Sequence, residues 1–353
     1  MLHLLAPASR FCLAGRMVGL SLAALWVATG CDGDSPESPG PAAAAPPTQG
    51  RWETLAPMPA LPRFYVGVGA ARGQVFVVGG FRQNRTPTPV ELDVSRAVHA
   101  YDTTTAAWKT LAPLPASFEM ANVAGVGERL FVLGGLENTT SLEYDFAADA
   151  WLSRAPLPVE RGRGAAAVGV HGTRVLLAGG ILRGQSANNL NTGMRVPELL
   201  AYDTVMDTWQ VLPAMPQSNG YAMGAILGNE FWVLGGSTDF VRTDEVLAYD
   251  LVSGAWTVKP ALPRTLSSAA VAVLGGRIYL TGGIATSVGM ISPDTMVLDP
   301  ATGMWSTVAP LGTPRFGTGG AVVDGRLYVP TGLAMGATEH DFQTVPTLEV
   351  FIP

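Results

Sequence analysis

The segment VFVVGG at residues 75–80 recurs along the chain with small variations. Each copy is a short apolar run that ends in two glycines, and the copies follow one another at intervals of about 50 residues. Such runs of β-branched and aromatic residues predict buried strands, and the glycines predict a backbone geometry that a side chain would hinder. The other copies are LFVLGG at 130–135, VLLAGG at 175–180, FWVLGG at 231–236, IYLTGG at 278–283 and a degraded LYVPTG at 327–332.

Further features accompany these copies in a constant order. A strand of small apolar residues precedes the copy across a tight turn, a strand ending in Tyr-Asp follows it, and a tryptophan then precedes a proline-rich exit. This order predicts four short strands per unit, which we letter a to d. The Tyr-Asp pairs are 101–102, 144–145, 202–203 and 249–250, with 298–299 as a Leu-Asp variant, and the tryptophans are Trp108, Trp151, Trp209, Trp256 and Trp305.

This combination of diglycine, Tyr-Asp, tryptophan and proline resembles the kelch repeat across residues 51–353. The resemblance implies an all-β fold, a six-bladed kelch-type β-propeller in which each four-stranded sheet covers the next. Galactose oxidase-like copper enzymes and the exported sialic acid mutarotases use similar propellers. The expected units are about 61–115, 116–158, 159–216, 217–263, 264–311, and 312–353 together with 51–60.

The two ends of the repeat region complement each other. The last unit stops after LEVFIP at 348–353, which matches a third strand, and it has no tryptophan strand. WETLAPMP at 52–59 matches a fourth strand, but no diglycine precedes it. We therefore expect residues 51–60 to complete the last blade and to close the ring, which would pair two otherwise exposed strand edges.

The first fifty residues have the pattern of an export signal and a tether. Residues 1–16 contain Arg10 and Arg16 and no acid, and residues 17–30 form an apolar run of signal-peptide length. The small residues before Cys31 resemble the lipobox of bacterial lipoproteins, although Ala28 stands where leucine is usual. We expect a signal peptide at 1–30 and a lipid-anchored Pro/Ala-rich linker at 31–50. The alternative is an ordinary cleaved signal peptide with a chance cysteine.

These features predict a lipid-anchored protein of the bacterial cell envelope, in the periplasm or at the cell surface. Membrane contact would be made through the N-terminal lipid only. The formal net charge is −6 and the chain has two lysines, so nucleic-acid binding, which needs a basic patch, is not expected. Cys12 lies in the leader, so the mature chain would hold no disulfide and no cysteine-based metal site. We expect a monomer without a metal or cofactor.

The candidate ligand site lies on the face where the b–c connections and the d–a corners meet. The b–c connections are long at residues 81–96 and 181–197, and long loops on a rigid scaffold commonly carry binding sites. Arginines beside aromatic residues at an axial mouth could hold carboxylates or sulfates. The alternative is that these arginines pair with neighbouring backbone or acids. The candidate ligand-binding residues are Arg63, Tyr65, Arg161, Arg163, Tyr221, Arg242, Arg264, Arg315 and Phe316.

The leading functional prediction is a binding or scaffold module for an unidentified protein or glycan, without catalytic residues. Copper chemistry of the galactose oxidase type is excluded, because it needs a cysteine cross-linked to tyrosine and no cysteine follows Cys31. The alternative is a carbohydrate-active enzyme that resembles sialic acid mutarotase (N-acetylneuraminate epimerase). The segment 242–244 resembles the arginine end of that family's functional loop, but Gly236 stands where its glutamate is expected.

Overall fold

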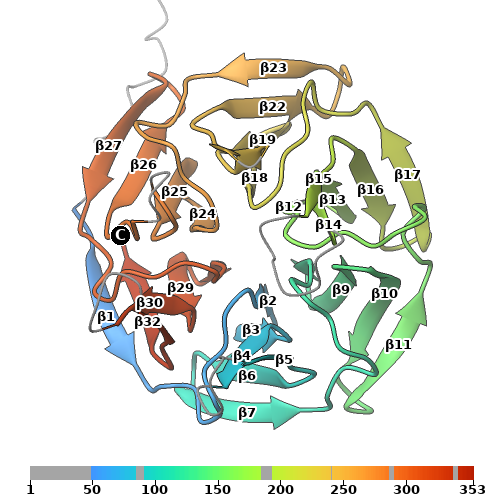
Figure 1. Cartoon of the computed structure of the whole chain (residues 1–353), viewed down its shortest axis with the longest axis vertical. Helices are drawn as coiled ribbons and strands as arrows, with labels where there is room; N and C mark the ends of the chain where they lie inside the picture. Colours follow the sequence, from blue (N-terminus) through green and yellow to red (C-terminus); the bar gives the residue numbers. More distant parts are fainter. Residues whose placement is uncertain (1–48, 85–90, 184–192, 240, 286–289, 337–340) are drawn as a thin grey trace, which may run out of the picture. The chain divides into compact units, whose positions relative to one another are not determined.

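A computed structural model describes residues 49–353 except 85–90, 184–192, 240, 286–289 and 337–340 (Figure 1). In these ranges the regular elements are β-strands, and six four-stranded antiparallel sheets stand radially around an axis (Figure 1). The predicted all-β, six-bladed propeller is confirmed. The first three blades, from the axis outward, are β2 (Gly67–Ala71), β3 (Gln74–Val78), β6 (Val98–Asp102) and β7 (Ala107–Leu111); β8 (Val123–Val126), β9 (Arg129–Gly135), β10 (Asn138–Asp145) and β11 (Ala150–Arg154); and β12 (Ala167–His171), β13 (Arg174–Ala178), β16 (Leu199–Asp203) and β17 (Thr208–Leu212).

The remaining three blades repeat this order, and the last draws its outer strand from the beginning of the described chain. They are β18 (Met223–Leu227), β19 (Glu230–Leu234), β22 (Val246–Asp250) and β23 (Trp256–Lys259); β24 (Ala270–Leu274), β25 (Arg277–Thr281), β26 (Thr295–Asp299) and β27 (Met304–Val308); and β28 (Ala321–Val323), β29 (Arg326–Pro330), β32 (Leu348–Ile352) and β1 (Arg51–Leu55).

The b–c connections of four blades continue as short two-stranded ladders on one face, which we call the b–c face. These ladders are β4 (Phe81–Asn84) with β5 (Glu91–Val94), β14 (Ile181–Leu182) with β15 (Met194–Arg195), β20 (Ser237–Thr238) with β21 (Val241–Arg242), and β30 (Leu333–Met335) with β31 (Phe342–Thr344). Blade two has a short b–c connection, because β9 ends at Gly135 and β10 begins at Asn138.

The ring closes through β1 and β32, as the sequence predicts. They pair antiparallel from Arg51 opposite Ile352 to Leu55 opposite Leu348. The ring of Trp52 lies 5.3 Å from that of Phe351, and its indole nitrogen donates a hydrogen bond to the Ala309 carbonyl at 3.0 Å. The first strand of the propeller is therefore fixed to both the last blade and the blade before it.

The outer-strand tryptophans connect successive blades. Trp108, Trp151, Trp209 and Trp256 each donate from the indole nitrogen to a backbone carbonyl in the exit of the preceding blade, at 2.8–3.0 Å. Each also packs on the tyrosine of its own Tyr-Asp pair, with ring centroids 4.8–5.2 Å apart. The repeated Tyr-Asp and tryptophan signals therefore report contacts between sheets as well as within them.

The aspartates of the Tyr-Asp pairs close the c–d turns. Asp203 accepts hydrogen bonds from the backbone nitrogens of Val205 and Met206, both at 3.0 Å, and Asp102, Asp145 and Asp250 repeat this arrangement. These backbone donors are the main cause that holds the pKa of Asp203 below its usual value. Because short Asx turns of this kind order the chain locally, one aspartate per repeat is enough to set the hairpin.

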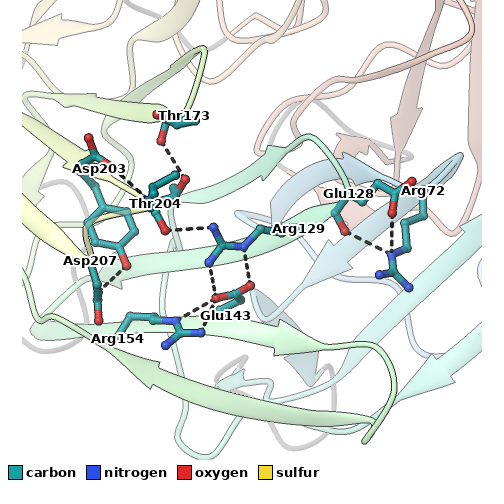
Figure 2. A network of polar contacts seen from close by, with 11 residues as sticks. Arg72, Glu128, Arg129, Glu143, Arg154, Thr173, Asp203, Thr204 and Asp207 are labelled. Carbon is teal, nitrogen blue, oxygen red and sulfur yellow. Dashed lines mark hydrogen bonds and ion pairs between the residues drawn. The ribbon is translucent and has the colours of Figure 1, made fainter.

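An ion-pair network strengthens the contact between blades two and three (Figure 2). The Glu143 carboxylate accepts hydrogen bonds from Arg129 at 2.6 and 2.7 Å and from Arg154 at 2.8 Å. Arg129 also donates to the Thr204 carbonyl of blade three at 2.9 Å (Figure 2). Glu143 is only 8% exposed, and its hydrogen bond with Arg129 is the main cause that lowers its pKa.

Replacing Trp209 by phenylalanine tests the inter-blade hydrogen bonds. The change leaves the Ala155 carbonyl without its indole donor, so the free energy of unfolding should fall by about 1 kcal/mol more than in Trp305→Phe. Trp305 is the matched control, because its indole nitrogen is buried without a hydrogen-bond partner among the described residues. Urea denaturation of both variants gives the difference, and equal losses would show that the hydrogen bond adds nothing.

Candidate functional site

Six equivalent residues at the start of the inner strands form a ring at the b–c face end of the axis. All six have left-handed backbone angles, with φ between 48° and 63°. Backbone hydrogen bonds join five successive pairs of this ring at 2.5–3.2 Å, for example Tyr221 N to Ala165 O. The positive φ is therefore imposed by contacts between blades. The members are Tyr65, Met120, Ala165, Tyr221, Ser268 and Gly317.

Two tyrosines of this ring meet across the axis. The ring centroids of Tyr65 and Tyr221 lie 5.6 Å apart, and the Tyr65 side chain hydrogen-bonds to that of Ser268. Phe316 packs against Tyr65 at 6.2 Å. Burial raises the pKa of both tyrosines above the ordinary value, so both hydroxyls are protonated and uncharged near neutral pH.

Arg195 and Arg242 lie next to these tyrosines on two neighbouring ladders. The Arg195 guanidinium carbon is 5.8 Å from the Tyr221 ring centre, and Arg195 donates to Gly193 O at 2.6 Å and Ser237 Oγ at 3.1 Å. Arg242 Nε donates to Ser267 Oγ at 3.2 Å. Burial lowers the pKa of both arginines, while the positive charge of each opposes the rise in the Tyr65 pKa. Two cations are thus held beside one pair of tyrosines.

These two arginines occupy the same position in their blades. Each pairs with the first residue of its ladder, Arg195 with Ile181 and Arg242 with Ser237. The same position holds Val94 in blade one and Ile291 in blade five. Blades three and four therefore carry a charge where blades one and five carry an apolar side chain and blade six carries Thr344, so the repeat does not need a charge at this position.

Exposed apolar side chains border the arginines. Met194 is 58% exposed and Val241 is 66% exposed, and each directly precedes one of the two arginines. Met290 of blade five, before Ile291, is 59% exposed. Large apolar side chains exposed at equivalent positions of three neighbouring blades indicate a contact surface. We call Met194, Arg195, Val241, Arg242 and Met290 the b–c rim.

Comparisons with known proteins agree with the propeller fold. The kelch motif model matches residues 62–115 and 265–312, which contain most of blades one and five. A solved structure of YjhT covers 83% of this chain and 95% of its own, with a TM-score of 0.67 at 15% identity, a likeness that shows the fold alone. The chain is a kelch-repeat β-propeller.

Curated kelch proteins share part of this propeller. Kelch-like protein terF of Aspergillus terreus is 29% identical over 205 residues, which cover 54% of this chain and 43% of that protein. Kelch-like protein 35 of Mus musculus is 27% identical over 172 residues, 47% of this chain and 26% of that protein. Beta-scruin of Limulus polyphemus is 23% identical over 192 residues, 50% of this chain and 19% of that protein. The chain spans less than half the length of each of these relatives.

Three of the predicted ligand-binding arginines are buried inside the kelch propeller. Arg63, Arg163 and Arg315 are 0–2% exposed. Arg63 donates to the carbonyls of Gly79 and Ala97, both at 2.6 Å, and Arg315 bonds Glu349 and the Thr347 carbonyl. Arg163 pairs with Glu198 at 3.2 Å. Their terminal guanidinium nitrogens bond to groups of their own blades, so a ligand role for them stays a prediction without support from their position.

The other predicted residues lie nearer the b–c face. Arg161 pairs with Glu137 at 2.5 Å, and Arg264 pairs with Asp294 at 2.6 Å. Phe316 is 6% exposed and belongs to the apolar cluster under this face. Tyr65, Tyr221 and Arg242 are the predicted residues that the structure brings together, and Phe316 touches Tyr65.

Sequence reasoning missed Arg195, although a signal was present. Arg195 and Arg242 stand at the same distance before the Tyr-Asp pair of their blades. Aligning the third strands backward from Tyr-Asp would have placed both arginines at one structural position. The distance along the sequence from the diglycine differs, with 15 positions from Gly180 to Arg195 and 6 from Gly236 to Arg242, so an alignment anchored on the diglycine misses this equivalence.

The remaining predictions about ligands concern metals and the N-terminal region. Among the described residues, no group of three or more His, Cys, Asp or Glu side chains is placed to hold a metal ion. Cys31 and the linker before residue 49 lie outside the described residues. Within the described ranges, no helix has the length and hydropathy needed to cross a membrane.

His99 gives the buried arginine Arg63 a pH-dependent partner. Arg63 Nη2 donates to His99 Nδ1 at 2.8 Å, and His99 is 3% exposed. Burial, with a contribution from the Arg63 charge, lowers the pKa of His99 to about 4 from 6.5. Between pH 4 and pH 6.5 the histidine is protonated in the unfolded chain and neutral in the folded one. The stability that neutral His99 contributes is therefore fully present above pH 6.5 and is lost as the pH falls toward 4.

His99→Gln should remove this part of the acid sensitivity. Glutamine keeps an acceptor for Arg63 but does not titrate, so between pH 6.5 and 4 the variant should lose roughly 2–3 kcal/mol less unfolding free energy than the parent. Chemical denaturation across that range measures the difference. His171→Gln, at an exposed position, is the control. Parallel pH profiles for the parent and His99→Gln would contradict the prediction.

Proposed function

We propose that the protein is a binding module that holds an acidic, partly apolar protein segment on the b–c rim. A kelch propeller supports a protein-binding or scaffold role in general. The observation that carries this specific proposal is the pair of equivalent arginines, Arg195 and Arg242, in positions that are apolar in blades one and five.

The chemistry of the rim favours carboxylates. A guanidinium offers a planar fork of donors that matches a carboxylate, and it keeps its charge when partly buried. Both arginines are already oriented by protein acceptors, Gly193 and Ser237 for Arg195 and Ser267 for Arg242. Less side-chain entropy is then lost when a ligand binds, so the same contacts give a higher affinity.

The apolar part of the rim favours a peptide over a glycan. Met194, Val241 and Met290 expose flexible or branched hydrocarbon, which packs well on apolar side chains and poorly on sugar hydroxyls. A segment with Asp or Glu next to Leu, Met or Phe would satisfy both parts of the surface.

Fluorescence anisotropy with labelled peptides tests this proposal. In a peptide array with graded numbers of acidic and apolar residues, the best binders should combine both types. The double variant Arg195→Ala/Arg242→Ala should weaken their binding at least tenfold, and added salt should weaken it further. Arg174→Ala is the control, because Arg174 is exposed and pairs with Asp203 away from the rim. Equal binding by the double variant and the control would overturn the proposal, as would retention of acidic glycans and no peptide on parallel arrays.

Mutarotation of sialic acid is the second candidate, and Arg242 beside Tyr65 is the observation that favours it. Gly236 has φ of +99°, and a Cβ there would lie 2.2 Å from Asn219 Oδ1. A carboxylate at that position is sterically disfavoured, so a catalytic base would have to come from elsewhere. Exchange NMR of sialic acid anomers separates the two functions, because only an enzyme accelerates the exchange.

We also propose that the protein is a cell-envelope lipoprotein anchored through Cys31. The apolar run at 17–30 and the small residues before Cys31 support this proposal. In a bacterial host, Cys31→Ser should lose the mass of the acyl chains and move from the membrane to the soluble envelope fraction. Intact-mass measurement and fractionation test it, with Cys12→Ser as the control. An unchanged mass and location for Cys31→Ser would exclude the lipid anchor.

A further inference from the structure

A cavity of about 500 Å³ lies on the axis of the propeller, between the inner strands of all six blades. Its volume falls within the range of small-molecule sites. Its wall includes residues from β2, β8, β12, β18, β24 and β28, so each blade contributes to it. The b–c rim residues do not belong to this wall.

The tyrosine pair bounds the cavity toward the b–c face. Tyr65 and Tyr221 both line the cavity, and their rings lie 5.6 Å apart across the axis. Tyr221 is 8% exposed. At the other end the wall reaches Val322, the central residue of β28, which is 38% exposed. The exposure of Val322, against the burial of Tyr221, indicates that the cavity opens at the face of the a–b hairpins.

Two kinds of groups form the wall. Aliphatic side chains such as Val168, Ile226 and Val273 supply apolar surface. Each inner strand is also the edge of its sheet, paired only with the second strand of its blade. The backbone N–H and C=O groups of the free edge therefore face the axis and remain available to a ligand.

Neighbouring blades fix the positions of these strands. A Cβ added at Gly125 would lie 1.7 Å from the Ala70 carbonyl oxygen, and one at Gly224 would lie 2.4 Å from Val168 O. The inner strands thus approach each other at backbone distance. A ligand would meet a preformed wall and would not need to order it on binding.

The wall is electrically neutral. Among the described residues that line the cavity, none is Asp, Glu, Lys, Arg or His. The polar side chains at the tyrosine end of the cavity carry uncharged hydroxyl groups and one amide, and they include Tyr65, Ser268 and Thr318. An ion in this cavity would lose hydration without meeting a counter-charge among the lining residues, whereas a neutral molecule would not carry that cost.

We propose that the axial cavity is a second binding site, for a neutral small molecule with an apolar body and hydroxyl or amide groups. The apolar body packs on the valines and isoleucine, and its polar groups bond to the edge-strand backbone and to the hydroxyls at the tyrosine end. The site is separate from the b–c rim, so the two can be tested independently.

N-phenyl-1-naphthylamine, a neutral fluorophore with one N–H donor, is the probe. It should bind saturably, one molecule per chain, with enhanced fluorescence.

Val322→Trp and Ile226→Trp narrow the cavity and should each weaken binding at least tenfold. Val258→Trp, the same change on the outer strand β23 at a residue 75% exposed, should leave binding unchanged. Thermal melting checks that all three variants stay folded, and Val322, being exposed, tolerates the larger ring best.

The anionic relative 1-anilinonaphthalene-8-sulfonate tests the charge argument, because it adds a sulfonate to the same aromatic skeleton. It should displace the neutral probe at least tenfold less effectively than unlabelled N-phenylaniline does. Absence of saturable binding, unchanged affinity in both cavity variants, or preferential displacement by the sulfonate would each overturn the proposal. Loss of neutral-probe binding in Arg195→Ala/Arg242→Ala would also contradict it, since it would place the probe on the b–c rim.

Discussion

Every blade of this propeller depends on contact with two neighbours, and the pairing of β1 with β32 gives the first and last blades theirs. Without this pairing, the last sheet would have three strands. The hydrogen bond from Trp52 to the Ala309 carbonyl of blade five would also be lost. A four-stranded sheet cannot cover both of its own faces, so the apolar clusters of the core mostly span two adjacent blades. Closing the ring is what turns six unstable sheets into one domain.

The same closure fixes the ring of left-handed residues at the axis. Tyr65 and Tyr221 are held with positive φ by hydrogen bonds to adjacent blades, and this directs their rings toward each other. The tyrosine pair then separates two different environments along one axis. The b–c rim combines Arg195, which is 8% exposed, and the half-buried Arg242 with exposed apolar side chains, while the lining of the cavity beyond the tyrosines is uncharged.

The arginines show how one residue type serves two purposes in a repeated fold. Arg63 and Arg315 occupy the same corner position and satisfy backbone carbonyls that the repeat leaves buried. Burial lowers their pKa values to about 10, yet both remain charged at neutral pH. Arg195 and Arg242 occupy a position where blades one and five have Val94 and Ile291, so the repeat can be built without a charge there.

The amino-acid sequence by itself determined the all-β fold, the six blades and the closing strand. It could do so because glycine pairs, Tyr-Asp turns and tryptophans act locally and recur in one order, and because the missing outer strand of the last unit was found at residues 52–59. It also placed Tyr65, Tyr221 and Arg242 near the axial mouth.

Only the tertiary structure decided which arginines are buried and which border the rim, and that an uncharged cavity lies behind the tyrosines. The backbone nitrogen of Arg63 donates to the hydroxyl of Thr331, which is 268 residues away in sequence, and the tyrosines meet from blades one and four. Burial and contact across the axis depend on how distant blades pack, and no local pattern in the chain records that packing.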